Sequence, residues 1–259
     1  MNRYPALAGV RVGCVQYLNS KPLIHGCDVP VTFDHPSGLA RALAAGELDV
    51  ALVPVFEALR TPGYVAVDGV AIASDGPVFS VFLAYRGRLE DIRTISLDPA
   101  SLTSAHLLQV LLAEFHGLRP DFVHSGDGIP DAALLIGNQA IEFRTHDHHH
   151  DHEFLDLGEE WKRQTGLPFV YALWLMRGDL EEQRAVADDL RALKRDGVQH
   201  ISEIVAADTT HNPALSTRYL TEHIRYDLGE REKTAIARFR ELLVKYGLVA
   251  DAGSALEWI

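Results

Sequence analysis

The chain passes from a short apolar strand into a polar corner in the sequence Arg11-Val12-Gly13-Cys14-Val15-Gln16-Tyr17-Leu18-Asn19-Ser20-Lys21-Pro22. The apolar residues up to Val15 are typical of a buried strand, and the side chain of Asn19 or Ser20 is suited to cap a following helix. Pro22 fits the first turn of that helix. Free backbone N–H groups at such a corner favour an anion, and corners of this kind hold the ligands of α/β proteins. The sequence therefore predicts a ligand contact here.

Apolar runs and helical patterns alternate through the first part of the chain, which is typical of βαβ units. The predicted strands are Val10–Val15, Val29–Phe33, Asp49–Pro54, Val65–Ala73 and Val78–Tyr85, and the predicted helices are Ser20–His25, Pro36–Ala45 and Val55–Leu59. This alternation predicts a mostly parallel sheet.

A second α/β unit begins with a strand at Arg93–Asp98. The cluster Ser101-Leu102-Thr103-Ser104 is rich in capping residues and precedes a predicted helix over Ala105–Glu114. Further strands are expected at Asp121–His124, Ala132–Ile136 and Phe169–Met176, and helices at Leu180–Val205, with a break near Gly197, Pro213–His223 and Glu230–Tyr246.

This layout predicts an α/β protein of two lobes with a ligand cleft between them. The crossover segments are expected at Tyr85–Leu89 and Met176–Asp179, because each follows a strand and carries a glycine that can absorb a hinge rotation. Residues 1–86 and 178–259 would then form lobe 1, and residues 87–177 would form lobe 2.

Composition excludes several classes of partner. The 259 residues are 47% hydrophobic and include 36 acidic and 24 basic residues, a formal net charge of −12. A protein with this excess of negative charge is unsuited to bind the phosphate backbone of a nucleic acid. No segment approaches the ~20 apolar residues of a membrane span, and residues 1–10 lack a signal-peptide pattern. We therefore expect a cytoplasmic protein that contacts neither nucleic acid nor membrane.

A tract rich in histidine runs from Thr145 to Glu153, with five histidines between His146 and His152. Imidazoles and carboxylates at this density can bind zinc or nickel. A continuous polar run outside any apolar period is more often a solvated loop, and a metal site also needs an outer shell that orients its ligands. We therefore predict no functional metal.

Five ordered segments of the chain resemble the chorismate dehydratase branch of the menaquinone biosynthesis family, whose members begin the futalosine route. The segments are Val15–Pro22, Val78-Phe79-Ser80-Val81, Ser96–Ser104, Leu134-Leu135-Ile136-Gly137-Asn138-Gln139-Ala140 and Asp156–Val170. The resemblance implies a two-lobed fold like that of type II periplasmic binding proteins. It also implies a hydro-lyase (a carbon–oxygen lyase) that removes water from chorismate to give 3-[(1-carboxyvinyl)oxy]benzoate, with no metal or organic cofactor.

The resemblance also transfers four polar cleft residues to this sequence, namely Asn19, Ser80, Thr103 and Ser104, and the neighbouring corner residues add further candidates. Asn19 and Ser80 become the expected catalytic residues, because they can orient the ring and assist the departing hydroxyl by hydrogen bonding. The expected substrate-binding residues are Tyr17, Ser20, Lys21, Ser101, Thr103, Ser104, Gly137 and Asn138. The family commonly has arginine where this chain has Leu102, so the charge that meets a substrate carboxylate would come from Lys21, from Arg86 or from a helix N-terminus alone.

Chorismate is a dianion, so local dipoles must stabilise two carboxylates within an acidic protein. The corners at Asn19–Lys21, Ser101–Ser104 and Gly137–Gln139 each offer free N–H groups at a predicted helix start. The hydroxyls of the second corner could instead only cap a helix. No histidine or carboxylate pair stands out as a base, which favours one of the substrate's own carboxylates as the proton acceptor.

Two other functions fit the same pattern. One is 1,4-dihydroxy-6-naphthoate synthase, the cyclic futalosine lyase of the same family, although the chain offers no evident histidine at a strand end to serve as its base. The other is a non-catalytic cytoplasmic solute-binding protein, since folds of this kind are also used for capture alone. The partner in each case is a small molecule, and a homodimer is a candidate assembly.

Overall fold

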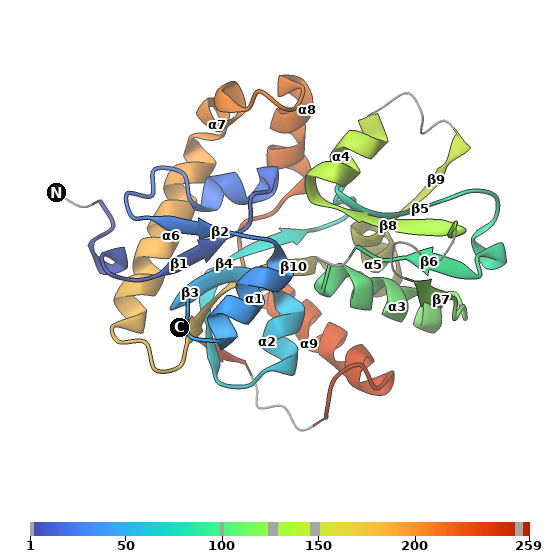
Figure 1. The fold of residues 1–259 in the computed structure, drawn as a ribbon, viewed down its shortest axis with the longest axis horizontal. Helices are drawn as coiled ribbons and strands as arrows, with labels where there is room; N and C mark the ends of the chain where they lie inside the picture. The colour runs from blue at the N-terminus through green and yellow to red at the C-terminus, as the bar shows by residue number, and fades with distance from the viewer. Residues whose placement is uncertain (1–2, 99–100, 124–128, 146–150, 252–255) are drawn as a thin grey trace.

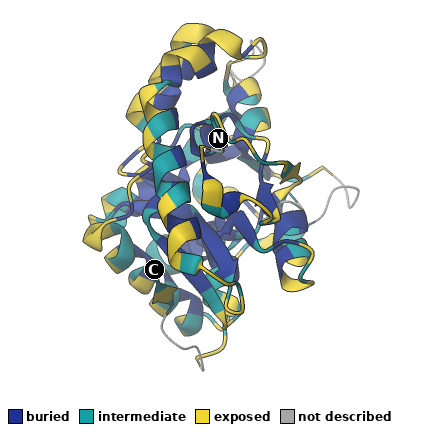
Figure 2. Ribbon diagram, turned by 90° about the vertical axis from the view of Figure 1, so that its left-hand side faces the viewer, coloured by how far each residue is buried: buried dark blue, intermediate teal, exposed yellow. Residues whose placement is uncertain are grey.

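Two β-sheets lie side by side in the computed structural model, each covered by helices (Figure 1). The structure describes residues 3–98, 101–123, 129–145, 151–251 and 256–259. Buried residues fill the strands and the helix faces that are turned toward them, whereas exposed residues lie on the outer helix faces (Figure 2). No described helix combines the length and the hydropathy that crossing a membrane requires.

The first sheet has six strands in the order β11-β4-β10-β3-β1-β2. These strands are β1 (Val12–Cys14), β2 (Val31–Phe33), β3 (Val50–Pro54), β4 (Tyr64–Ser74), β10 (Phe169–Arg177) and β11 (Glu257–Trp258). Strand β1 pairs in parallel with β2 and β3, but β10 is antiparallel to both β3 and β4. The sheet is therefore mixed, and its centre is buried on both faces, as the near-continuous apolar run of β3 indicates.

The second sheet has five strands in the order β7-β6-β8-β5-β9. They are β5 (Val81–Tyr85), β6 (Thr94–Ser96), β7 (Asp121–Val123), β8 (Ala132–Ile136) and β9 (Glu153–Asp156). Strands β6, β7 and β8 are parallel, whereas β5 runs antiparallel to β8 and β9.

The helices connect and cover these sheets. They are α1 (Pro36–Ala44), α2 (Val55–Arg60), α3 (Thr103–Phe115), α4 (Gly137–Thr145), α5 (Leu157–Thr165), α6 (Gln183–Gln199), α7 (Ile201–Ala207), α8 (Pro213–Arg218) and α9 (Glu230–Lys245), with 3₁₀ turns η1 (Pro5–Leu7), η2 (Leu18–Leu23) and η3 (Leu89–Asp91) and a π-helical turn η5 (Tyr219–His223). The predicted helix over Leu180–Val205 is thus two helices, which meet at His200, close to the break predicted near Gly197.

Two strands next to the predicted lobe boundaries belong to the sheet of the other predicted lobe. Strand β5, which the prediction placed in lobe 1, belongs to the second sheet, and β10, which the prediction placed in lobe 2, belongs to the first sheet. An apolar run predicts a strand but does not say which sheet the strand joins. We therefore propose that the crossovers are residues 75–80 and 157–168, one strand earlier than the sequence suggested.

The polar corner after β1 folds as the 3₁₀ turn η2 instead of an α-helix, and the residue at its N-cap is Tyr17, with no side-chain cap. Asn19 and Ser20 therefore lie inside the turn and do not cap it. Helix α6 packs closely against this turn, since a Cβ atom on Gly197 would lie 1.8 Å from the carbonyl oxygen of Pro22. Glycine at position 197 is what allows this close approach.

Replacing Gly197 with alanine should force α6 away from η2, because the Cβ atom would overlap backbone that cannot rotate away. We expect Gly197→Ala to lower the free energy of unfolding by about 2 kcal/mol or more. Urea unfolding measures this loss, with Arg195→Ala, an exposed site on the same helix, as the control. Equal stability of the two variants would contradict the packing described here.

Candidate functional site

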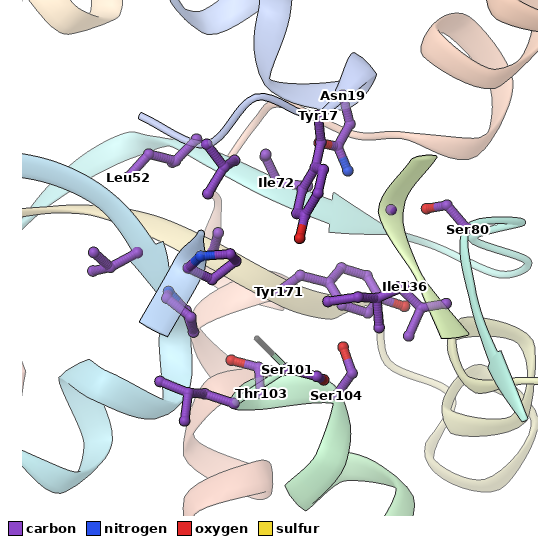
Figure 3. A pocket seen from close by; sticks show the side chains of 18 of the residues that line it. Tyr17, Asn19, Leu52, Ile72, Ser80, Ser101, Thr103, Ser104, Ile136 and Tyr171 are labelled. Carbon is purple, nitrogen blue, oxygen red and sulfur yellow. The ribbon is translucent and has the colours of Figure 1, made fainter. Parts of the chain in front are cut away.

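A cavity lies between the two sheets, with a volume of about 600 Å³ that includes its opening to solvent. Segments far apart in the sequence form its walls, and a concave, mostly apolar lining with a few polar groups is typical of small-molecule sites. Its lining residues are Val15, Tyr17, Asn19, Pro36, Leu52, Val53, Pro54, Ile72, Val78, Ser80, Val81, Ser101, Leu102, Thr103, Ser104, Ile136, Gly137, Tyr171 and Ala172. Figure 3 shows Tyr17 and Asn19 on one side of this space and Ser101, Thr103 and Ser104 on the opposite side.

The lining is apolar apart from hydroxyl and amide groups. Among the described residues that line the cavity, there is no lysine, arginine, histidine or carboxylate side chain. Burial raises the pKa of Tyr17 to about 12 and raises the pKa of Tyr171 above its usual value. Both phenols are therefore neutral at physiological pH and act as hydrogen-bonding groups.

The structure brings seven of the ten predicted site residues to this cavity, namely Tyr17, Asn19, Ser80, Ser101, Thr103, Ser104 and Gly137. They come from η2, the first crossover, the start of α3 and the start of α4. Their roles toward a substrate stay predictions.

The other three predicted residues, Ser20, Lys21 and Asn138, line a neighbouring hollow that shares only Val15 and Tyr17 with the cavity. Successive side chains of a 3₁₀ turn point about 120° apart, so Asn19 faces the cavity and the next two residues do not. Ser20 Oγ lies 2.6 Å from the carbonyl oxygen of Val15, and Lys21 Nζ lies 3.3 Å from Asp208 Oδ1.

Asn138 serves as a contact between the two halves of the molecule. Its side-chain oxygen accepts a hydrogen bond from the backbone N–H of Leu18 at 3.0 Å. Leu18 belongs to η2 on the side of the first sheet, and Asn138 belongs to α4 on the side of the second. The Asn138 oxygen is thus bound to protein, and a contact between Asn138 and the ligand stays a prediction.

Tyr219 is a site residue that the sequence did not reveal. Its hydroxyl lies 3.1 Å from Asn19 Nδ2 and 2.7 Å from Ser80 Oγ, and the residue is 1% exposed. The side chain comes from the π-helical turn η5, at a sequence distance of 139 residues from Ser80. No local motif marks it, because an apolar helical pattern covers residues 213–223 and tyrosine fits that pattern as a core residue.

The hydrogen bonds of Tyr219 determine what Asn19 and Ser80 offer to the cavity. Burial raises the pKa of the Tyr219 phenol, which therefore keeps its proton. Since the amide N–H of Asn19 donates to the Tyr219 oxygen, the phenol proton can go to Ser80 Oγ, which leaves the serine proton free to donate. The side-chain oxygen of Asn19 is buried and has no hydrogen-bond partner. The pair therefore presents the Asn19 oxygen as an acceptor and the Ser80 hydroxyl as a donor.

The start of α3 forms the opposite wall. Its N-cap residue is Leu102, which makes no side-chain cap, so the interpretation of Ser101, Thr103 and Ser104 as mere capping residues is wrong. The Oγ atom of Ser101 is buried without a hydrogen-bond partner. An uncapped helix N-terminus carries partial positive charge and free N–H groups, so this wall is suited to an anion.

Thr103 also joins the two halves of the molecule. Its Oγ1 atom accepts a hydrogen bond from the backbone N–H of Phe56 in α2 at 3.2 Å. The ring of Phe56 stacks on His106 of α3, with their ring centroids 3.6 Å apart. These contacts fix the start of α3, and with it this wall of the cavity, against the first sheet.

At the third predicted corner, the Gly137 N–H and the Gln139 side chain already donate to protein groups. The backbone N–H of Gly137 donates to the carbonyl oxygen of Ser80 at 2.8 Å, and the side chain of Gln139 donates to Asp98. Gly137 has a φ of +62°, and a Cβ atom there would lie 2.9 Å from the ring of Tyr17. Glycine is therefore needed at this position, because the tyrosine ring closes directly over it.

The histidine tract lies largely outside the described residues, which omit 146–150. Within the described ranges, no group of three or more histidine, cysteine, aspartate or glutamate side chains is placed to hold a metal ion.

The fold matches that of solved proteins with the periplasmic-binding-protein fold. Over 94% of this chain and 91% of the other, it superposes on the Candida albicans protein CA3427, which has the generic periplasmic binding protein fold, with a TM-score of 0.63 and 14% sequence identity. The predicted fold class is thereby confirmed. The chain is a two-lobed protein of the periplasmic-binding-protein fold with a cavity between its sheets.

Sequence comparison narrows this class to a family. A family model described as menaquinone biosynthesis matches residues 10–245, so the chain belongs to that family. The chain is similar to the chorismate dehydratase of Thermus thermophilus, with 29% identity over 90% of this chain and 94% of that protein. It is also 25% identical to the chorismate dehydratase of Campylobacter jejuni, over 86% of this chain and 88% of that protein.

The role of the Tyr219 hydroxyl can be tested by a substitution that removes the hydroxyl and keeps the ring. If this hydroxyl orients Asn19 and Ser80, Tyr219→Phe should lower kcat by about 100-fold, as the loss of one oriented hydrogen-bond group in an active site commonly does. Steady-state kinetics on the enzyme's substrate measure the change. Tyr226→Phe is the matched control, because the Tyr226 hydroxyl is also buried but has no hydrogen-bond partner. Equal kcat values for the two variants would remove Tyr219 from the site.

Proposed function

We propose that the protein is a chorismate dehydratase, a hydro-lyase that converts chorismate into 3-[(1-carboxyvinyl)oxy]benzoate and water. Membership of the menaquinone biosynthesis family and similarity to two chorismate dehydratases along most of the chain support this function. The observation that carries the proposal is the cavity, which has apolar walls for a ring, the pair Asn19 and Ser80 on one side and an uncapped helix N-terminus on the other.

In this reaction a ring hydroxyl leaves with its bonding electrons, and the neighbouring ring carbon loses a proton. The electron pair of the broken C–H bond completes the aromatic ring, and the proton and the hydroxyl together account for the water. The elimination is redox-neutral. Because aromatisation drives it, the protein has mainly to hold the ring in place and to stabilise the leaving group.

We propose that Ser80 donates its proton in a hydrogen bond to the departing hydroxyl, while Asn19 orients the ring edge. The hydrogen bond from Tyr219 supports this role, because it leaves the Ser80 hydroxyl proton free toward the cavity. As the leaving group gains negative charge, this hydrogen bond strengthens. It is therefore expected to lower the barrier more than it tightens substrate binding.

The proton acceptor in this proposal is one of the substrate's own carboxylates. The described residues that line the cavity include no imidazole, amine or carboxylate, and the phenols are neutral at physiological pH. A carboxylate carried by the substrate is already held close to the ring, so it can take the proton without help from a side chain.

The other substrate carboxylate is proposed to bind at the start of α3. Leu102 lines the cavity where the family commonly has arginine. Of the two cations that could replace it, Lys21 pairs with Asp208 and Arg86 is exposed after β5. The helix N-terminus and the hydroxyl of Ser101 are left as the groups that meet the anion. We propose no metal or organic cofactor. A cytoplasmic location and a homodimer stay predictions.

Incubation of the purified, metal-stripped protein with chorismate tests this function. Chromatography and mass spectrometry should show a product that has lost one water. Asn19→Ala and Ser80→Ala should each lower turnover by about 100-fold with a far smaller effect on thermal stability. Ser216→Ala is the matched control for Ser80, because Ser216 is fully buried and its hydroxyl has no hydrogen-bond partner.

Unchanged turnover in both Asn19→Ala and Ser80→Ala would contradict their catalytic roles. Absence of turnover by the native protein would contradict the proposed function. In that case, thermal stabilisation by chorismate would indicate a non-catalytic binding protein, and no stabilisation would direct the search to the cyclic futalosine lyase reaction or another ligand.

A further inference from the structure

The residue before Ser80 has an unfavourable backbone conformation. Phe79 has a φ of +69°, in the left-handed region that bulky side chains rarely adopt. Such a conformation persists only where neighbouring groups enforce it, and it is often found next to functional residues. Since residue 79 sets the direction in which the chain enters Ser80, the groups that enforce this conformation also place the Ser80 hydroxyl.

Asp156 supplies the enforcing contacts. Its Oδ1 atom accepts the backbone N–H of Val78 at 3.0 Å, and its Oδ2 atom accepts the backbone N–H of Phe79 at 2.8 Å. The residue is 3% exposed. Two adjacent backbone donors thus converge on one buried carboxylate, which requires them to point in nearly the same direction.

Arg144 completes the arrangement from α4. Its Nη1 atom lies 3.3 Å from the carbonyl oxygen of Phe79 and 3.4 Å from Asp156 Oδ2. The guanidinium carbon lies 4.7 Å from the centre of the Phe79 ring, which permits a cation–π contact. The N–H, the carbonyl and the ring of Phe79 are therefore all held by this ion pair.

The result is a Ser80 residue that is fixed on every side. The Asp156–Arg144 pair holds the residue before it, the N–H of Gly137 binds its carbonyl oxygen at 2.8 Å, and its hydroxyl lies 2.7 Å from that of Tyr219. A change of Phe79 to a negative φ would redirect the chain and move the hydroxyl away from Tyr219.

We propose that the Asp156–Arg144 ion pair is a positioning device for Ser80, which holds Phe79 in the left-handed conformation and so aims the Ser80 hydroxyl at the leaving group. The proposal rests on the proposed function, because it assigns Ser80 to that reaction. Asp156 also caps α5, through the N–H groups of Gly158 and Glu159 at 3.1 Å each. A test must therefore separate positioning from a simple loss of helix stability.

The variant Asp156→Asn keeps the shape of the side chain but turns one acceptor oxygen into a donor that would oppose a backbone N–H. We expect kcat for chorismate to fall at least ~10-fold while KM changes less than ~3-fold, as for an interaction that matters in the transition state. Glu160→Gln is the control, because Glu160 is equally buried in α5 and pairs with Arg163 at a site away from Ser80. It should lower the melting temperature and leave kcat unchanged.

A second substitution reveals whether the effect passes through residue 79. Glycine adopts a φ of +69° without strain, so Asp156→Asn should lower kcat less than ~3-fold when it is introduced into Phe79→Gly. An equal loss in both backgrounds would overturn the proposal. Should Asp156→Asn not fold, Arg144→Met, which leaves the α5 cap intact, should still lower kcat at least ~3-fold at constant KM. Unchanged kcat would overturn the proposal.

A crystal structure of Asp156→Asn keeps this inference apart from the proposed function. The proposal predicts that residue 79 leaves the left-handed region and that Ser80 Oγ moves out of hydrogen-bond distance of Tyr219. An unchanged Phe79 and Ser80 would overturn it. Failure of the native protein to dehydrate chorismate would count against the proposed function alone, and this structure would then decide whether the ion pair positions Ser80.

Discussion

The hydroxyl group of Tyr219 joins residues that belong to different parts of the molecule. Asn19 comes from the turn after the first strand, and Ser80 comes from the crossover into the second sheet. A buried phenol with two partners is costly to disrupt, because any separation of the partners leaves a polar group unsatisfied. This contact therefore helps to hold the two halves together and to direct both side chains. The Thr103–Phe56 and Asn138–Leu18 hydrogen bonds also join the halves.

The second constraint is electrostatic. The chain carries a net charge of −12, and a dianion would enter a cavity whose described lining has no cationic side chain. Backbone dipoles and hydroxyls can stabilise anions where their positions are fixed in advance, since no reorganisation is then required. A neutral cavity also suits a reaction in which the substrate supplies the base, because a cationic partner would lower the basicity of that carboxylate. The apolar side chain of Leu102 in the cavity lining is consistent with a site that uses no cationic side chain.

The sequence predicted the fold class and seven of the residues that line the cavity, because apolar periodicity marks strands and ligand contacts follow strand ends. It missed features that depend on tertiary structure. The apolar patterns of β5 and β10 predict strands but do not show which sheet each strand joins. The expected crossovers therefore follow these strands, whereas the sheet order favours crossovers that precede them. Ser20 and Lys21 were expected beside Asn19 in the site, but the 3₁₀ geometry turns them away. Tyr219 reaches the site across 139 residues, and no local pattern encodes such a contact.

The central claim is that the cavity between the sheets holds the dianion without a cationic side chain. A crystal structure of the protein with 3-[(1-carboxyvinyl)oxy]benzoate bound tests this most directly. We expect one carboxylate within hydrogen-bond distance of Ser101 Oγ and the first backbone N–H groups of α3, with the ring between the apolar walls and its edge beside Ser80. A ligand in the neighbouring hollow, with its carboxylate on Lys21, would show that a cationic side chain holds the dianion.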